Sequence, residues 1–437
     1  EKAFKVCSIS VEFYSNLVNS GRLDFNFEYD LAYAYMNLGS ILDKLTRYED
    51  ALLIFNRAID IYKGSFEGNL MIGHSLASVY MNRGITLKNL NRYDEAITEY
   101  NLAISTLNYL TDKGFLITGD ILARIYNNLG ITLKCLTRYE ESIIACNYAI
   151  KTWEILIGRG WLELENALAS GYNNLGISLG KLNRYEEAIK EFKRVIEIRK
   201  RLVESGRLEI GNDLATAYGN LGIAFNGLER HEEAIEEFNR AIDIWKKLIK
   251  EGRRELESQL ASTHVNLGNT FRDLTNYREV VNEYGNAIDI WKKLIKEGRR
   301  ELKNQLAFTY MNQGNIFIHL NYHEKAIENF KNAIKILNCL LQEGDVWVYS
   351  DILSCYQILI LLYSRDHNNR EYAINIASDS INTILIVVNN REIRDSVSPF
   401  ITDIFRLIIE NHLWKPEHEE IVKYFGLAFN IVVPDKN

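Results

Sequence analysis

Hydrophobic and polar positions repeat along this chain with a fixed period. The pattern Asn-x-Gly returns seven times, with its glycines 45 residues apart once and 46 residues apart five times. The glycines are Gly39, Gly84, Gly130, Gly176, Gly222, Gly268 and Gly314. Repetition at a period of about 20 to 50 residues is typical of an array of small structural units. We therefore count positions from each glycine, which is offset zero of its repeat.

Each repeat predicts two α-helices. Apolar residues at offsets −7, −4, +3 and +6 lie on one side of a helix together with the glycine. The second helix has small residues at +12 and +19 and, in most repeats, an aromatic residue at +16. Small residues let two helix backbones approach closely, and the large ones fill the space between the helix pairs. A turn of the type Leu-x-Arg-Tyr joins the two helices of a repeat.

A glycine at offset −16 is predicted to end the second helix of the preceding repeat in the left-handed conformation. These glycines are Gly68, Gly114, Gly160, Gly206, Gly252 and Gly298.

The pair Leu-Gly followed by alanine, an aromatic residue and alanine resembles the tetratricopeptide repeat over about residues 31–341. Tyrosine replaces the family's usual tryptophan in the first helix, and the closing proline of the second helix is missing. The chain has three prolines, Pro399, Pro416 and Pro434. Without that stop the second helix can extend by about two turns, as in long-repeat relatives such as kinesin light chain. The resemblance implies an all-α fold, an α-solenoid made as a superhelix of antiparallel helix pairs.

The domain organisation follows from this register. Residues 1–22 are predicted to be the second helix of a truncated N-terminal repeat, because Glu1-Lys2-Ala3-Phe4 is similar to the start of a second helix at Glu324. We infer from this start that more protein lies N-terminal to the chain. Residues 23–344 are seven repeats, and residues 345–437 are a degenerate repeat and a C-terminal helical cap. In the degenerate repeat, Leu361 is expected in the glycine position and Ala373 in the small-residue position.

Composition narrows the function classes. The net charge is −7 and five cysteines are scattered without metal-ligand spacing, which favours a cytoplasmic protein with reduced thiols. The most apolar stretch, 358–363, is far shorter than the ~20 residues that span a membrane. The sequence contains no GxxxxGK, GxSxG, HExxH or GxGxxG motif. We therefore expect no enzyme, no catalytic residue, no cofactor and no metal.

An asparagine at offset −2 is the candidate binding feature. These seven ladder asparagines are Asn37, Asn82, Asn128, Asn174, Asn220, Asn266 and Asn312. They lie opposite the apolar stripe, although asparagine is a mediocre helix former. In the resembled family the first helices line a concave groove, and kinesin light chain has asparagine at the matching place. The resemblance implies that these carboxamides bind the backbone of an extended peptide. The alternative is that each asparagine hydrogen-bonds a neighbouring helix, and periodicity does not separate the two.

The same side of the first helices carries more positive than negative charge. Its accessory basic residues are Lys44, Lys88, Arg124, Lys134, Lys181 and Arg272, against Asp43 and Asp273. This excess favours an acidic or carboxylate-bearing ligand, with a solvated helix flank as the alternative. The lysine at −3 that a chaperone-tail carboxylate clamp needs is absent, since −3 holds Met, Asn, Gly or Val.

Three functions fit these features. The first is a scaffold whose groove binds a protein or peptide. The second is the sensor or regulatory arm of a larger bacterial signalling or defence protein, with a catalytic module N-terminal to this chain. The third, an RNA-binding helical array, needs a continuous basic inner surface with stacking aromatics and is the least favoured.

Overall fold

The structure, a computed structural model, describes residues 2–20, 25–65, 70–112, 119–364, 369–388 and 391–428. These residues form an all-α solenoid of tandem helix pairs, and no β-strand occurs within the described ranges. Contacts divide the chain into two units, Glu1–Arg230 and His231–Asn437, and each unit is described by itself.

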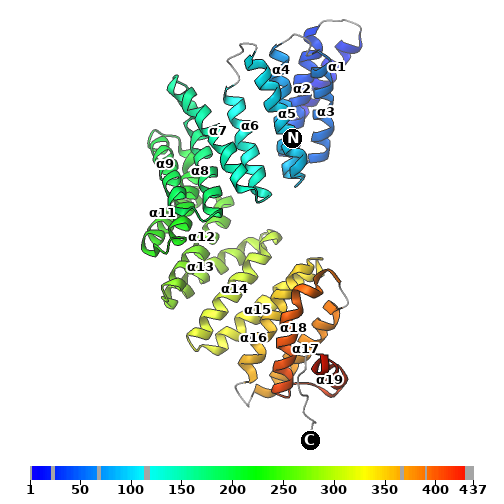
Figure 1. Cartoon of the computed structure of the whole chain (residues 1–437), viewed down its shortest axis with the longest axis vertical. Coiled ribbons are helices and arrows are strands. Elements are labelled where there is room, and N and C mark those ends of the chain that lie inside the picture. Colours follow the sequence, from blue (N-terminus) through cyan, green and yellow to red (C-terminus); the bar gives the residue numbers. More distant parts are fainter. Residues whose placement is uncertain are drawn as a thin grey trace. The chain divides into compact units, whose positions relative to one another are not determined.

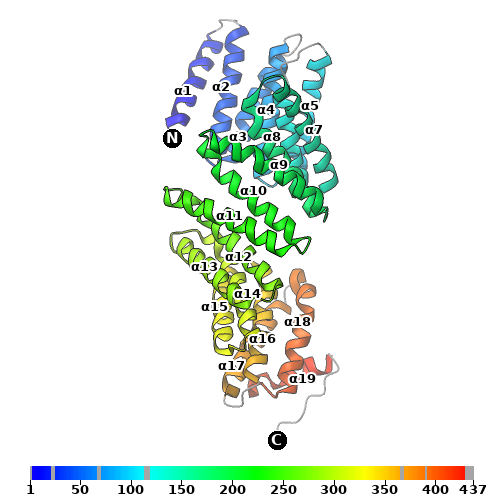
Figure 2. The same ribbon diagram turned by 90° about the vertical axis from the view of Figure 1, so that its left-hand side faces the viewer.

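Unit 1 is a row of helices in which each packs on the next along the chain (Figures 1 and 2). Its helices are α1 (Lys2–Asn19), α2 (Phe25–Lys44), α3 (Tyr48–Gly64), α4 (Leu70–Asn89), α5 (Tyr93–Asp112), α6 (Gly119–Cys135), α7 (Tyr139–Gly158), α8 (Glu165–Lys181), α9 (Tyr185–Glu204) and α10 (Gly211–Asn226). From α2 onwards, even-numbered helices are the first helices of the repeats and are called A helices. Odd-numbered helices are the second helices and are called B helices.

Unit 2 continues the same alternation. Its helices are α11 (His231–Lys250), α12 (Glu257–Asp273), α13 (Tyr277–Lys296), α14 (Lys303–His319), α15 (His323–Gln342), α16 (Tyr349–Ser364), α17 (Arg370–Val388), α18 (Arg391–Glu410) and α19 (Glu419–Ala428).

The glycine at offset zero is where the A and B helices of a repeat meet. A Cβ added to Gly39 would lie 2.6 Å from the Phe55 ring, and one added to Gly176 would lie 2.7 Å from the Phe192 ring. Real Cβ atoms do not approach so closely, so the aromatic ring at +16 occupies the space left by the missing side chain. The small residues at +12 and +19 are all fully buried. The predicted close approach of the two helices is confirmed.

The predicted longer B helix is confirmed. It does not account for the whole added length of the repeat, because part of that length forms another element. Helices α5, α7, α9, α11, α13 and α15 are each 20 residues long. A short 3-10 helix precedes several A helices, and its last residue is apolar and buried. These 3-10 helices are η2 (Leu162–Leu164), η3 (Leu208–Ile210), η4 (Arg254–Leu256), η5 (Arg300–Leu302) and η6 (Val346–Val348).

Left-handed residues end both helices of a repeat. Gly160, Gly206, Gly252 and Gly298 have φ between 97° and 105°, as predicted, while Gly68 and Gly114 lie outside the described residues. The turn from A to B also has a left-handed residue in every repeat, and it is never glycine. These residues are Thr46, Asn91, Thr137, Asn183, Glu229, Thr275 and Asn321, with φ between 57° and 61°. The sequence did not predict them.

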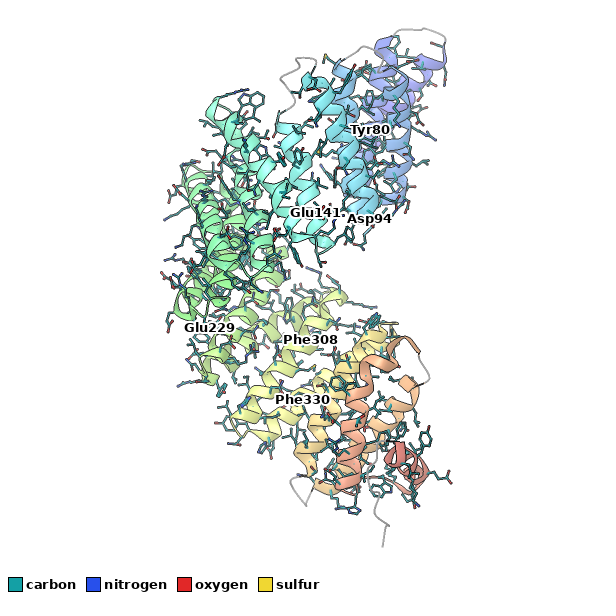
Figure 3. The ribbon with its side chains drawn as sticks, in the orientation of Figure 1. Tyr80, Asp94, Glu141, Glu229, Phe308 and Phe330 are labelled. Carbon is teal, nitrogen blue, oxygen red and sulfur yellow. The ribbon has the colours of Figure 1, made fainter. Side chains whose placement is uncertain are left out.

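Ion pairs connect successive repeats along the edge of unit 1 where the B helices begin. Arg92, which directly precedes α5, pairs with Glu95 in the first turn of that helix at 2.6 Å and reaches Glu49 of the preceding repeat at 3.7 Å. Asp94 and Glu141, labelled in Figure 3, mark this edge on α5 and α7. Because these pairs are exposed, they stabilise the array only slightly.

The C-terminal part of unit 2 corrects one assignment. Leu361 is 36% exposed whereas the neighbouring Ile360 is fully buried, so Leu361 does not occupy a buried position like that of the glycine in other repeats. Ala373 is fully buried, as expected. Pro399 lies inside α18.

Among the described residues, one helical segment, Val346–Ser364, is long and apolar enough by length and composition to cross a membrane, and 56% of it is buried inside the structure. A core helix passes the same test, and α16 packs on α15, α17 and α18.

Candidate functional site

The five ladder asparagines of unit 1 lie on one face of its A helices. Helices α2, α4, α6, α8 and α10 contact one another in chain order, so they line one side of the unit. All seven ladder asparagines are half-buried, and the remaining two, Asn266 and Asn312, lie on α12 and α14 of unit 2. We call the exposed side of α2, α4, α6, α8 and α10 that carries the asparagines the inner face of unit 1.

Three ladder asparagines hydrogen-bond the A helix of the preceding repeat. Asn174 Nδ2 donates to Asn127 Oδ1 at 3.0 Å, and Asn220 Nδ2 donates to Asn173 Oδ1 at 3.0 Å. Asn82 Nδ2 donates to Ser40 Oγ at 3.3 Å. Each of these bonds uses one of the two amide N–H groups of the side chain. It therefore orients the amide and leaves the second N–H group available.

The other four ladder asparagines behave differently. Within the described part of the chain, the side chains of Asn37, Asn128, Asn266 and Asn312 make no hydrogen bond to another residue, although all four are half-buried. Their amide groups are therefore open to solvent or to a ligand.

A second column of amides accompanies the ladder in the middle of unit 1. Asn127 and Asn173, at offset −3, accept the hydrogen bonds from the next repeat. Sequence reasoning missed their role because it considered offset −3 only for a carboxylate clamp. The recurrence of Asn-Asn at 127–128 and 173–174 was the available signal.

Three of the predicted basic residues interact electrostatically on the inner face. They are Lys88 of α4, Lys134 of α6 and Lys181 of α8. Burial lowers the pKa of Lys134, and the positive charges of Lys181 and Lys88 lower it further. Lys134 Nζ donates to Asn174 Oδ1 at 3.3 Å, which fixes that amide. Among the described residues none of the three lysines forms an ion pair with a carboxylate.

The remaining predicted basic residues add less uncompensated positive charge to the inner face. Arg124 pairs with Asp120 at 2.8 Å, and Arg272 pairs with Asp273 at 3.1 Å, so neighbouring carboxylates already offset both charges. Lys44 lies exposed at the end of α2.

A hollow of about 660 Å³ interrupts the inner face between α8 and α10. Ile177 and Ile223 line it from the two A helices, and Phe192 of α9 lies among its apolar lining residues. Lys181 and Asn220 add polar groups. Gly180 lies at offset +4, where the two preceding repeats carry Lys88 and Lys134, so the missing side chain helps to open the hollow.

This arrangement offers amide and ammonium donors beside apolar side chains. Such groups bind a ligand by hydrogen bonds, charge and burial of apolar surface. No three His, Cys, Asp or Glu side chains gather to hold a metal ion within the residues that the structure describes.

Comparison with known sequences gives one family. Two family models described as tetratricopeptide repeat match the chain, one at residues 167–247 and 213–293 and the other at 32–64, 77–106 and 309–336. No curated protein sequence matches it.

Comparison with solved structures finds similar folds at low sequence identity. A signal transduction ATPase with numerous domains, with a tetratricopeptide repeat sensor, from Pyrococcus horikoshii is 13% identical with a TM-score of 0.54, over 91% of this chain and 52% of that one. BtubC from P. vanneervenii is 23% identical with a TM-score of 0.48, over 58% and 92%. A Rap protein complexed with competence and sporulation factor is 14% identical with a TM-score of 0.45, over 94% and 95%.

The repeat pattern, the helix pairs and the matching family models agree. The chain belongs to the tetratricopeptide repeat family.

Proposed function

We propose that this protein is a non-catalytic, cytoplasmic scaffold that holds an extended segment of a partner protein along the inner face of unit 1. The observation that carries the proposal is a column of half-buried amides with spare hydrogen-bonding groups. Lys88, Lys134 and Lys181 accompany it and form no ion pair with a carboxylate among the residues that the structure describes. Residues of α6, α8 and α10 form its centre, because the two amide columns, two of the lysines and the hollow meet there.

An amide column suits an extended backbone. Each asparagine can both donate and accept, and a peptide in an extended conformation presents both kinds of group along its length. Half-burial strengthens such bonds because less water competes for them. Recognition of this kind depends little on the side chains of the bound segment.

A purely architectural role does not account for the whole ladder. The side chains of Asn174 and Asn220 donate to the preceding A helix. Within the described ranges, the side chains of Asn128, Asn266 and Asn312 make no hydrogen bond to another residue. Asparagine in a helix interior costs up to ~0.7 kcal/mol relative to alanine. At these three positions no internal hydrogen bond offsets that cost, which supports a ligand as the partner.

The three lysines of the inner face support an acidic ligand. Lys88, Lys134 and Lys181 form a local positive column in a chain of net charge −7. Carboxylates of a bound segment would form charge-assisted hydrogen bonds with them. Their contribution should weaken as salt concentration rises.

A second candidate is the sensor arm of a larger signalling protein. The similar ATPase from Pyrococcus horikoshii is described as carrying a tetratricopeptide repeat sensor, and its fold matches over most of this chain. The two candidates share ligand binding on the inner face, and they differ in whether a catalytic module responds to it. Sequencing the upstream reading frame of the gene would separate them.

Selection from a random 12-residue peptide library tests the binding proposal. Peptides selected on the full chain should bind it, and the combined Asn128→Ala, Asn174→Ala and Asn220→Ala variant should lose at least about tenfold in affinity. Asn147→Ala, an exposed asparagine on α7, is the matched control and should bind normally. Equal binding by the triple variant would show that the ladder is architectural.

A further inference from the structure

The hollow between α8 and α10 has a feature that the ladder does not explain. It is lined by the exposed side chain of Ile223, which is 49% accessible, and by Ile177 and the ring of Phe192. Leaving such apolar surface in water is unfavourable, whereas covering it with an apolar group is favourable. A backbone-binding ladder alone gives no reason for an apolar hollow at this place.

Two glycines in α8 and at the end of α10 shape the hollow differently. A Cβ added to Gly227 would lie 2.4 Å from the Tyr185 ring, so Gly227 is needed for that ring to pack. A Cβ added to Gly180 would have no atom of another element within 4 Å. The space above Gly180 is therefore open and not required by the packing.

Positively charged side chains lie on one side of the hollow. Lys181 and Asn220 are among its lining residues, and Lys134 and Lys88 follow on the preceding repeats. None of these three lysines has an ion-pair partner among the described residues. An acidic group next to whatever fills the hollow would complement this charge.

We propose that the hollow anchors one bulky apolar side chain of the bound segment, and that a carboxylate beside it in the same segment faces Lys181. Gly180 determines which side chains fit, because it leaves the space open. This inference rests on the proposed function. It adds a preference for one side chain of the bound segment to a surface that otherwise binds only the backbone of that segment. At about 660 Å³, the hollow has room for a side chain together with some of its backbone.

A substitution at Gly180 is expected to fill the hollow and leave the fold intact. Gly180→Trp starts a large side chain from a Cβ that would have no neighbouring atom within 4 Å. Gly158→Trp is the matched control, because Gly158 at the end of α7 also has no neighbour within 4 Å and lies outside the hollow. Both variants should give the circular dichroism spectrum of the original chain, and neither should unfold at a lower temperature than it does.

The test uses peptides selected from the random library on the full chain. We expect them to share one bulky apolar residue with an aspartate or glutamate next to it. Alanine at the apolar residue should weaken binding at least about tenfold. Gly180→Trp should lower the affinity of the chain for the selected peptide by a similar factor. The variant should also bind the selected peptide and its alanine-substituted version equally. Gly158→Trp should bind as the original chain does.

Other results overturn the inference in distinguishable ways. If Gly180→Trp binds the peptide normally while the triple asparagine variant does not, the ladder binds ligand and the anchor is wrong. If no peptide is selected, both proposals fail. If Gly180→Trp instead changes the oligomeric state in size-exclusion chromatography with light scattering, a second copy of the chain occupies the hollow.

Discussion

Two glycines one helical turn apart on α8 give opposite predictions for the same substitution. Gly176 lies at offset zero against Phe192, and an added Cβ would be 2.7, 2.9 and 3.0 Å from three atoms of that ring. Gly180 has open space around it. Both gain helix propensity on changing to alanine, by about 1 kcal/mol. Overpacking at Gly176 should cost about 1 to 3 kcal/mol in addition.

The two variants should therefore differ by about 1 to 3 kcal/mol in stability, with Gly180→Ala the more stable. Urea unfolding followed by circular dichroism measures the difference, with midpoints compared under identical conditions because long arrays need not unfold in two states. Adding Phe192→Leu to Gly176→Ala should recover part of the loss. Equal midpoints for Gly176→Ala and Gly180→Ala would show that the A and B helices are not in the close contact described.

Three further predictions follow from single residues. Asn174→Ala should lower stability by about 1 kcal/mol in urea unfolding, because Lys134 and Asn127 lose a partner, whereas Asn128→Ala should not. Gly206→Ala should lower stability by about 1 to 2 kcal/mol despite open space, because φ is +97°. Burial raises the pKa of the Cys146 thiol to about 11, so at pH 8 iodoacetamide should label the exposed Cys135 and spare Cys146, as read by peptide mass spectrometry.

The repeat period predicted the helix pairs well because it is a packing rule. Glycine opposite an aromatic ring and alanine at the crossing points leave little choice of structure. The left-handed residue between the A and B helices was not predictable, because threonine, asparagine and glutamate all occupy it and the helix-end hydrogen bonds impose its conformation. The assignment of Leu361 failed because α16 carries apolar residues all round, so the pattern there does not define a register.

The candidate site was only partly predictable for a similar reason. Sequence spacing placed the ladder asparagines and the lysines on one side of the A helices. It did not show that Lys134 bonds Asn174, since those side chains belong to different repeats. The hollow depends on residues of three helices, and the absence of a side chain at Gly180 leaves no periodic signal.

Photo-crosslinking tests the central claim most directly. A library-selected peptide carrying benzoylphenylalanine would be irradiated with the full chain, and the attachment site mapped by mass spectrometry. The account predicts attachment to α6, α8 or α10, on the side that carries Asn128, Asn174 and Asn220. Attachment to the exposed sides of α7 or α9, or to unit 2 alone, would contradict it.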